Sequence, residues 1–226
     1  MKTKKRLFVT TDDISPKLFK NPSLDFFTRI AWYFPILIFL PVISYLFYKG
    51  FSENQLSLSV SVLTISGGVV VWTLFEYCTH RFLFHAHPTH KFLQKIHHTF
   101  HGIHHDFPQD TLRLVMPPSV SVPMSMLMYF GTQWVFQQLG AGFLYDVFFA
   151  SFLLGYLVYD EMHYASHHLN WKNKWFQDIK KQHMKHHFVE PDMGFGFTSN
   201  AWDRVFNTNF PEKEKVVIRD KQTDLV

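Results

Sequence analysis

The chain has 226 residues, of which 47% are hydrophobic, 18% aromatic and 18% charged, and its formal net charge is +4. Its single cysteine, Cys78, excludes a disulfide framework and a zinc site built on paired cysteines. The hydrophobic composition also excludes a disordered chain, which needs few apolar residues and a high net charge. Fifteen histidines are a large number for this length, and they are the main clue to function.

Four long segments are apolar and nearly free of charged side chains. A bilayer core about 30 Å thick requires roughly 20 such residues in a helix. The predicted spans are residues 30–48, 56–75, 119–139 and 143–159. The second contains Gly67 and Gly68, which allow helices to approach closely. The third and fourth are separated by a short glycine-containing segment, which favours a tight helical hairpin.

The predicted fold is therefore an all-α integral membrane protein with four transmembrane helices arranged as two hairpins. Residues 1–29 would form a cytoplasmic N-terminal segment, residues 30–210 the membrane domain and residues 211–226 a C-terminal tail. The first 29 residues lack the apolar region of a signal peptide. A soluble all-α domain with four buried helices is the alternative, but it would leave little polar surface.

The basic residues predict the orientation of this fold, because Lys and Arg accumulate on the cytoplasmic side of spanning helices. All of them except Lys49 lie before the first predicted span, between the second and third, or after the fourth. Both termini and the segment between the two hairpins are thus predicted to be cytoplasmic. Topology and anionic lipid explain these charges, so we expect no nucleic-acid partner.

Ten histidines form four clusters in the segments predicted to be cytoplasmic. Neutral imidazole is the commonest metal ligand, and a pair at i and i+4 on a helix can reach one metal. Ten ligands exceed the four of a structural zinc site, so we predict a cytoplasmic helical cap that carries a two-metal centre, with about five histidines for each metal. The predicted ligands are His80, His85, His101, His104, His105, His163, His167, His183, His186 and His187.

The remaining motifs narrow the reaction class. The sequence has no nucleophile elbow, P-loop or dinucleotide-binding fingerprint. A histidine-rich site with open positions suits iron and oxygen chemistry as well as zinc hydrolysis. At a membrane surface, oxidation of a lipid C–H bond fits best. A membrane metal-binding or transport protein is the alternative, although a transporter would need polar residues near the middle of its spans.

Four stretches resemble the membrane-bound fatty acid hydroxylase superfamily, and fatty acid 2-hydroxylases most closely within it. They are FEYCTHRFLFH at 75–85, HGIHHDFPQDTLRLVMPP at 101–118, GYLVYDEMHY at 155–164 and KQHMKHHFVEPDMGFGFTSNAWDRVFNT at 181–208. The resemblance implies that the ten histidines bind two iron ions, which use O2 to hydroxylate carbon 2 of a fatty acyl chain. It leaves open a sterol, carotenoid or other lipid substrate. Zinc could replace iron in the purified protein, because histidine sites accept both.

Further residues and partners are expected around this centre. Ligand histidines usually donate their second N–H to a carboxylate or carbonyl, and the candidates are Asp160, Glu76, Asp110, Glu161 and Asp203. His97 and His98 remain open as additional ligands. Some relatives carry an N-terminal cytochrome b5 domain with an HPGG motif, which this sequence lacks. The expected electron donor is therefore a separate cytochrome b5-like protein, ferredoxin-like protein or reductase that docks on the basic face.

Overall fold

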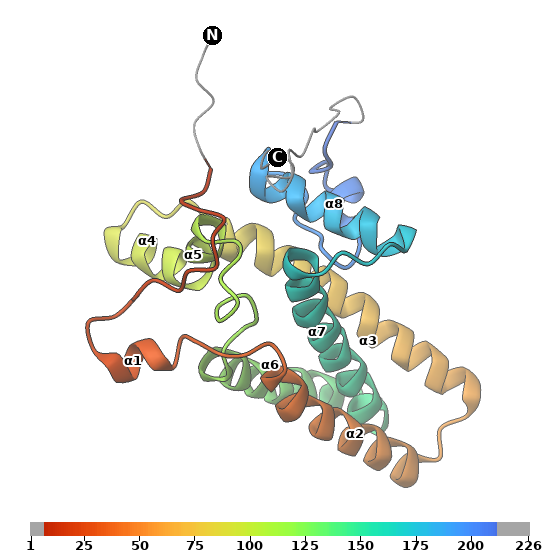
Figure 1. The fold of residues 1–226 in the computed structure, drawn as a ribbon. Coiled ribbons are helices and arrows are strands. Elements are labelled where there is room, and N and C mark those ends of the chain that lie inside the picture. The colour runs from red at the N-terminus through yellow and green to blue at the C-terminus, as the bar shows by residue number, and fades with distance from the viewer. Residues whose placement is uncertain (1–6, 212–226) are drawn as a thin grey trace.

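The computed structural model describes residues 7–211, and this part of the chain contains helices and loops but no strand (Figure 1). The α-helices are α1 (Pro22–Phe26), α2 (Phe34–Asn54), α3 (Leu58–Cys78), α4 (Lys91–His97), α5 (Ile103–Asp106), α6 (Pro118–Gln138), α7 (Tyr145–His168), α8 (Lys174–Phe188) and α9 (Ala201–Val205). The described residues also form three short helices of other types. They are the π-helices η1 (Thr79–Phe84) and η2 (His98–Gly102) and the 3-10 helix η3 (Gly142–Leu144). The all-helical prediction is confirmed for these residues.

Three helical segments among the described residues are long and apolar enough to cross a membrane: Phe34–Asn54, Leu58–Phe84 and Gly142–His168. They correspond to the first, second and fourth predicted spans. The third predicted span is also a helix, α6, but it does not reach the same hydropathy because it carries several serine and glutamine side chains. Membrane crossing by α6, and with it the topology of four spans, stays a prediction.

The boundaries of the spans differ from those predicted, for local reasons. Helix α2 begins at Phe34, with Pro35 in its first turn, where a proline costs no backbone hydrogen bond. Helix α7 continues to His168, well past the predicted end at 159. His163 and His167 therefore lie on the same rigid helix as the apolar part of the span.

Helix α7 is the centre of the bundle, and both α2 and α3 pack along it. Glycines make these contacts close. A Cβ on Gly68 of α3 would lie 2.5 Å from the carbonyl oxygen of Phe148, and one on Gly50 of α2 would lie 2.6 Å from Val147. Side chains at these two positions would push the helices apart, so the glycines set the spacing of α2, α3 and α7.

One ion pair joins α2 to α7 at the end of the bundle away from the histidines. Lys49 Nζ lies 2.9 Å from an Asp146 carboxylate oxygen. Lys49 is the one basic residue that the predicted topology puts on the non-cytoplasmic side, and Asp146 is an acidic residue inside a predicted span. Their pairing explains both exceptions, because a charge in an apolar region is costly unless it is paired.

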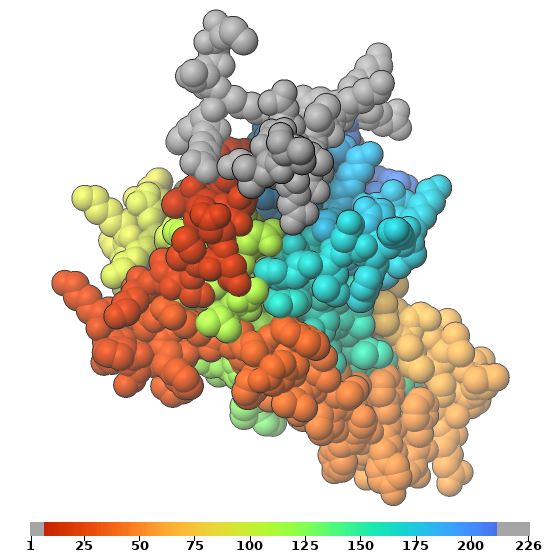
Figure 2. Space-filling view, viewed as in Figure 1, coloured from red at the N-terminus to blue at the C-terminus, as the bar shows by residue number. Residues whose placement is uncertain are grey.

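The N-terminal segment, residues 7–30, lies along the surface of the histidine-bearing region (Figure 2). The backbone N–H of Val9 donates to Asp106 O at 2.9 Å. Further along, the guanidinium of Arg113 contacts the carboxylates of Asp25 at 3.3 Å and Asp110 at 3.1 Å. The Arg113 side chain is only 4% exposed. It is thus a buried link between the segment and the bundle.

Candidate metal centre

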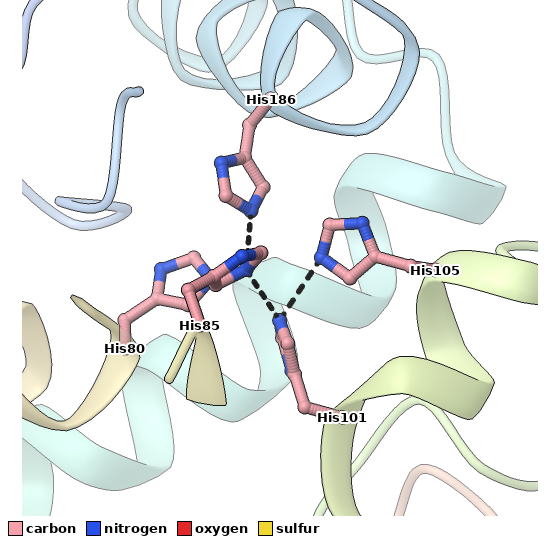
Figure 3. Close-up of side chains that lie close together, drawn as sticks. All are labelled: His80, His85, His101, His105 and His186. Carbon is pink, nitrogen blue, oxygen red and sulfur yellow. Dashed lines mark hydrogen bonds between the residues drawn. The ribbon is translucent and has the colours of Figure 1, made fainter. Parts of the chain in front are cut away.

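The structure brings the ten predicted histidines together in two groups of five, although they come from four separate parts of the chain. The first group is His80, His85, His101, His105 and His186, and the second is His104, His163, His167, His183 and His187. Within each group, one nitrogen from every ring lies within 4.8 Å of those from the other four. Figure 3 shows the rings of the first group pointing toward a common centre.

The two H-x2-H-H motifs each serve both groups. His101 and His105, at i and i+4, face the first group, whereas His104 between them faces the second. On α8 the outer pair, His183 and His187, faces the second group and His186 the first. Positions i, i+3 and i+4 of a helix share one face, so the spacing alone favours convergence of all three rings of a motif. Instead, each motif divides between the groups, which places the two groups side by side.

The rings of His80 and His85, five residues apart, come together through a π-helix that the sequence did not predict. In an α-helix, residues five apart point about 140° away from each other. The chain at η1 instead forms an i→i+5 turn, in which His85 N donates to His80 O at 2.9 Å. The ring centroids of His80 and His85 consequently lie 4.9 Å apart. A five-residue spacing between two candidate ligands is the signal that could have indicated this turn.

The spacing of the ring nitrogens in the first group fits a metal ion. Four Nε2 atoms follow one another, with 2.9 Å from His186 to His85, 3.1 Å from His85 to His101 and 3.0 Å from His101 to His105. A neutral ring nitrogen either donates or accepts, so one nitrogen cannot satisfy two such neighbours well. Metal–imidazole bonds of about 2.1 Å at right angles would separate adjacent nitrogens by about 3 Å. A shared cation accounts for all three separations.

The second group shows the same spacing with greater burial. The Nε2–Nε2 distances are 2.9 Å between His163 and His104, 2.8 Å between His167 and His183, and 3.1 Å between His187 and His183. All five residues are buried. Such a set of neutral donors, held away from water, matches the chemistry of a transition-metal site with imidazole ligands.

Burial keeps these rings in the form that binds metal. It lowers the pKa of His105 to about 3 and holds those of His101 and His186 well below the usual 6.5, with neighbouring histidines adding to the effect. In the second group, burial likewise lowers the pKa values of His183 and His187. Neutral imidazole has a free lone pair for a cation, so at neutral pH no proton competes for the site.

A loop after α8 fixes two rings of the first group through its backbone. The Nδ1 atom of His80 donates to Phe195 O at 2.6 Å, and that of His186 donates to Met193 O at 2.8 Å. Each bond leaves Nε2 free to face the centre of the group. Gly194 has φ of 70°, and a Cβ on Gly196 would lie 2.2 Å from Ser199 O. The GFG sequence is therefore needed for the path of this loop.

Two buried carboxylates hold the same loop. Asp203 accepts hydrogen bonds from the backbone N–H groups of Phe195 and Gly196 at 2.9 and 2.8 Å. Glu76 accepts from the N–H groups of Phe197 and Thr198 at 2.6 and 2.9 Å. Glu76 was expected to contact a histidine ring directly. Like Asp203, it contacts the loop instead. The loop carbonyls of Phe195 and Met193 are the groups that contact the histidine rings.

Two further candidate carboxylate partners, Asp160 and Asp110, also bond elsewhere. Asp160 accepts from Met116 N at 3.0 Å and from the Tyr156 hydroxyl at 3.1 Å. Asp110 binds Arg113 and the N–H of Leu112. Within residues 7–211, no hydrogen bond joins either carboxylate to a histidine ring. Both instead tie the segment 110–116 to its surroundings, which positions the wall of the site rather than its ligands.

His97 and His98 lie outside both groups. His98 Nε2 contacts a carboxylate oxygen of Asp106 at 2.8 Å and is half exposed. His97 lines an apolar cavity. His97 lies four residues before His101, which made it a candidate, but neither His97 nor His98 belongs to the two groups of five.

Two neighbouring cavities reach this region. The smaller, of about 170 Å³, is lined by His101, His104 and His163 together with polar groups that include Thr28 and Ser119. The larger, of about 550 Å³, lies between α3, α4, α6 and α7 and has an almost wholly apolar lining. Residues common to both linings are Phe84, Phe100, Met116, Val120 and Tyr159. An apolar space therefore adjoins a smaller, more polar one at the histidines.

Comparisons with known proteins agree with this arrangement. A family model described as "Fatty acid hydroxylase" matches residues 65–208. The chain is 37% identical over 201 residues to a dihydroceramide fatty acyl 2-hydroxylase of Arabidopsis thaliana, with 85% of this chain and 79% of that protein covered. It is 38% identical to a ceramide very long chain fatty acid hydroxylase of Schizosaccharomyces pombe, with 87% of this chain and 56% of that protein covered.

Similarity extends to a human relative and to a solved structure. Human fatty acid 2-hydroxylase is 33% identical over 220 residues, and the chain spans 57% of its length. The hydroxylase domain visible in the structure of full-length scs7p has a TM-score of 0.76 and 35% identity, with 87% of this chain and 72% of that one covered. The family model, the relatives and the histidine-lined cavities agree, and the chain belongs to the fatty acid hydroxylase family.

Proposed function

We propose that this protein is a membrane-bound lipid hydroxylase that adds a hydroxyl group at carbon 2 of fatty acids or of the fatty acyl chains of lipids. The observation that carries the proposal is the pair of buried five-histidine groups beside a large apolar cavity. The names of the relatives support it, because they include fatty acid 2-hydroxylases and hydroxylases of ceramide and dihydroceramide.

The ten histidines are proposed to hold two metal ions, one in each group. Their neutral rings and nitrogen separations near 3 Å fit the ligand set of such a pair. Bound as iron, the two ions would supply the activation of O2 that insertion of oxygen into an unactivated C–H bond requires. Zinc would fit the same nitrogens without that reactivity, so a protein purified with zinc would be an inactive form of the same site.

The two cavities suggest how a substrate would lie. An acyl chain would occupy the larger apolar cavity, and the adjoining carboxyl or amide group would occupy the smaller one, near Thr28 and Ser119. The histidines line the smaller cavity next to where the two meet. A carbon close to the polar end of the lipid would therefore lie nearest the metals, which is the position that 2-hydroxylation requires.

Aromatic rings would keep water away from the reacting carbon. The ring of Phe197 lies 5.6 Å from that of His163 and 5.0 Å from that of His183, and Phe195 covers His80 at 5.9 Å. Tyr159 stacks on His163 at 5.8 Å. These rings surround the histidines with apolar surface, and exclusion of water protects a reactive oxidant from side reactions.

Orientation and electron supply are further parts of the proposal. The distribution of Lys and Arg supports a cytoplasmic location for both termini and for the histidine clusters.

Oxygen insertion consumes electrons, so the enzyme would need a donor, either cytochrome b5-like, ferredoxin-like or a reductase. The basic character of the chain, with an isoelectric point near 9.0, favours an acidic donor.

The proposal can be tested by mass spectrometry of hydrolysed lipids from cells that express the protein together with a donor. We expect 2-hydroxy fatty acids with the intact protein and none with the His186→Ala, His187→Ala variant, which removes one ligand from each group. His87→Ala is the control, because this side chain is 81% exposed and lies outside both groups. Hydroxylation at another carbon, or equal product from the double variant, would refute the proposal.

A further inference from the structure

We propose that Trp72 forms the floor of the apolar cavity and sets the longest acyl chain that the protein accepts. This inference rests on the proposed function, since it concerns the same cavity. It adds a residue that determines chain-length selectivity, and it identifies the close contact of α3 with α7 as the feature that ends the cavity.

Trp72 lies at the end of the cavity away from the histidines. A helix rises about 1.5 Å per residue, so Trp72 lies about 12 Å from His80 along the continuous helix formed by α3 and η1. On α7, the lining residue farthest from His163 is Phe152, about 16 Å away along the helix. The two rings meet with their centroids 5.3 Å apart. Between them they close the space that separates α3 from α7.

Beyond this aromatic pair, the helices leave no room for a chain. Gly68, one turn before Trp72 on α3, lies so close to α7 that a Cβ there would meet Phe148 O at 2.5 Å and Ser151 Cβ at 2.7 Å. No lipid chain can pass between two backbones at that separation. Between α3 and α7 the cavity therefore ends at Trp72 and Phe152, and a longer chain that lies along these two helices would collide with the indole.

The indole is firmly supported from behind. A Cβ on Gly155 of α7 would lie 2.5 Å from ring atoms of Trp72, so the ring cannot move toward α7. Trp72 is 6% exposed and also contacts Phe75 and Tyr156. Among the described residues, its buried Nε1 has no hydrogen-bond partner. A polar group left unpaired costs stability, so the indole serves here by its size and shape rather than by hydrogen bonding.

Replacing the indole should lengthen the cavity in steps. Trp72→Ala would open the space above Gly68, and Trp72→Phe would open less of it. Ser125→Phe offers the opposite change, because Ser125 lines the cavity from α6 and a phenyl ring there would fill part of it. Discrimination by an apolar pocket amounts to about tenfold for each methylene that is accommodated or excluded.

The test compares the intact protein with Trp72→Ala, Trp72→Phe and Ser125→Phe by two readouts. The first is the chain-length profile of 2-hydroxy fatty acids in the expressing cells. The second is the profile of acyl chains that the purified protein retains, extracted and measured without any reaction. Trp134→Ala is the matched control, because this tryptophan is on α6, 63% exposed, and does not line the cavity.

We expect Trp72→Ala to raise the ratio of long to short chains about tenfold in both profiles, Trp72→Phe to raise it less and Ser125→Phe to lower it. If the intact protein and its three cavity variants retain the same profile of acyl chains, the inference is overturned, whether or not 2-hydroxy products form. A shift in the retained chains without 2-hydroxy product from any of them would support Trp72 as the floor and refute the proposed reaction. The two proposals can therefore fail separately.

Discussion

The ring of His186 is held at one nitrogen by Met193 O and presents the other to four neighbouring histidines. His80 is held in the same way by Phe195 O. Both carbonyls belong to a loop whose N–H groups are fixed by Asp203. Asp203 therefore positions two of the proposed ligands without contacting either ring, and its effect on metal binding can be measured.

We predict that Asp203→Asn weakens metal binding by about tenfold, at the lower end of the effect of removing a group that orients a ligand directly. The amide would keep one acceptor but turn an NH2 group toward a backbone N–H. Metal affinity can be measured by competition with a chelator of known strength. Asp192→Asn is the matched control, because its side chain is 58% exposed and pairs with the exposed ring of His87. Equal affinities in the two variants would contradict this role of Asp203.

The titration of His105 gives a second prediction at this scale. Burial lowers its pKa to about 3, from an ordinary value of 6.5. Between these values the unfolded chain binds a proton that the folded protein does not, so stability is complete above pH 6.5 and declines as the pH falls toward 3. We therefore expect the thermal unfolding midpoint of the metal-free protein to be lower at pH 5.5 than at pH 7.5.

The dependence should be weaker in His105→Gln, which cannot bind that proton, and unchanged in His87→Gln, whose ring is exposed. The measurement is the unfolding midpoint in detergent with a chelator present. A midpoint independent of pH in the intact protein would show that burial does not keep these rings neutral.

At the scale of elements, the packing of α3 on α7 depends on one of two adjacent glycines. A Cβ on Gly68 would overlap Phe148 O and Ser151, whereas one on Gly67 would meet nothing within 4 Å. We predict that Gly68→Ala destabilises the protein by about 2 kcal/mol, the usual cost of forcing extra atoms into a closely packed contact. Gly67→Ala is the matched control and should have little effect.

These two variants can be compared by the fraction of protein that stays monodisperse in detergent after heating. Equal loss in both would mean that α3 and α7 are not in contact at Gly68. The sequence pair GG indicated a close approach of helices. It did not indicate which glycine makes the contact, because that depends on the rotation of α3 about its axis.

The connection of the N-terminal segment to the bundle gives another prediction for an element. Arg113 is buried between Asp25 and Asp110, and its removal would take the ion pair from buried Asp110 and leave Asp25 with Arg29. We expect Arg113→Ala to cost about 3 kcal/mol and to release residues 7–30 from the surface. Limited proteolysis should then cut this segment faster. Lys95→Ala, at an exposed position on α4, should leave the cleavage rate unchanged.

The sequence predicted which ten histidines come together, because helical spacing places such residues on common faces. It did not predict how the H-x2-H-H motifs divide, since the division depends on where α5 and α8 lie relative to α3 and α7. It also missed η1 and the carbonyls of Met193 and Phe195. The backbone of any residue has a carbonyl, so no residue type marks these positions.

For the molecule as a whole, apolar length predicted where the long helices lie, and their ends depended on local packing and on Pro35. The helix α6 was predicted as a span from its length, its apolar residues and its lack of charged side chains. Its serine and glutamine side chains lower its mean hydropathy below that of the three apolar helices. The cavities were not visible in the sequence, because each is lined by residues from several helices that meet only in the fold.

The central claim for the whole molecule is that each five-histidine group binds one metal ion. The most direct test is the metal-to-protein ratio, measured by elemental mass spectrometry on protein purified without chelator and supplied with iron. The account predicts two metal ions per chain in the intact protein and close to one in His85→Ala, His186→Ala, which removes two ligands from the first group only. A ratio of one or less in the intact protein, or an undiminished ratio in the variant, would contradict it.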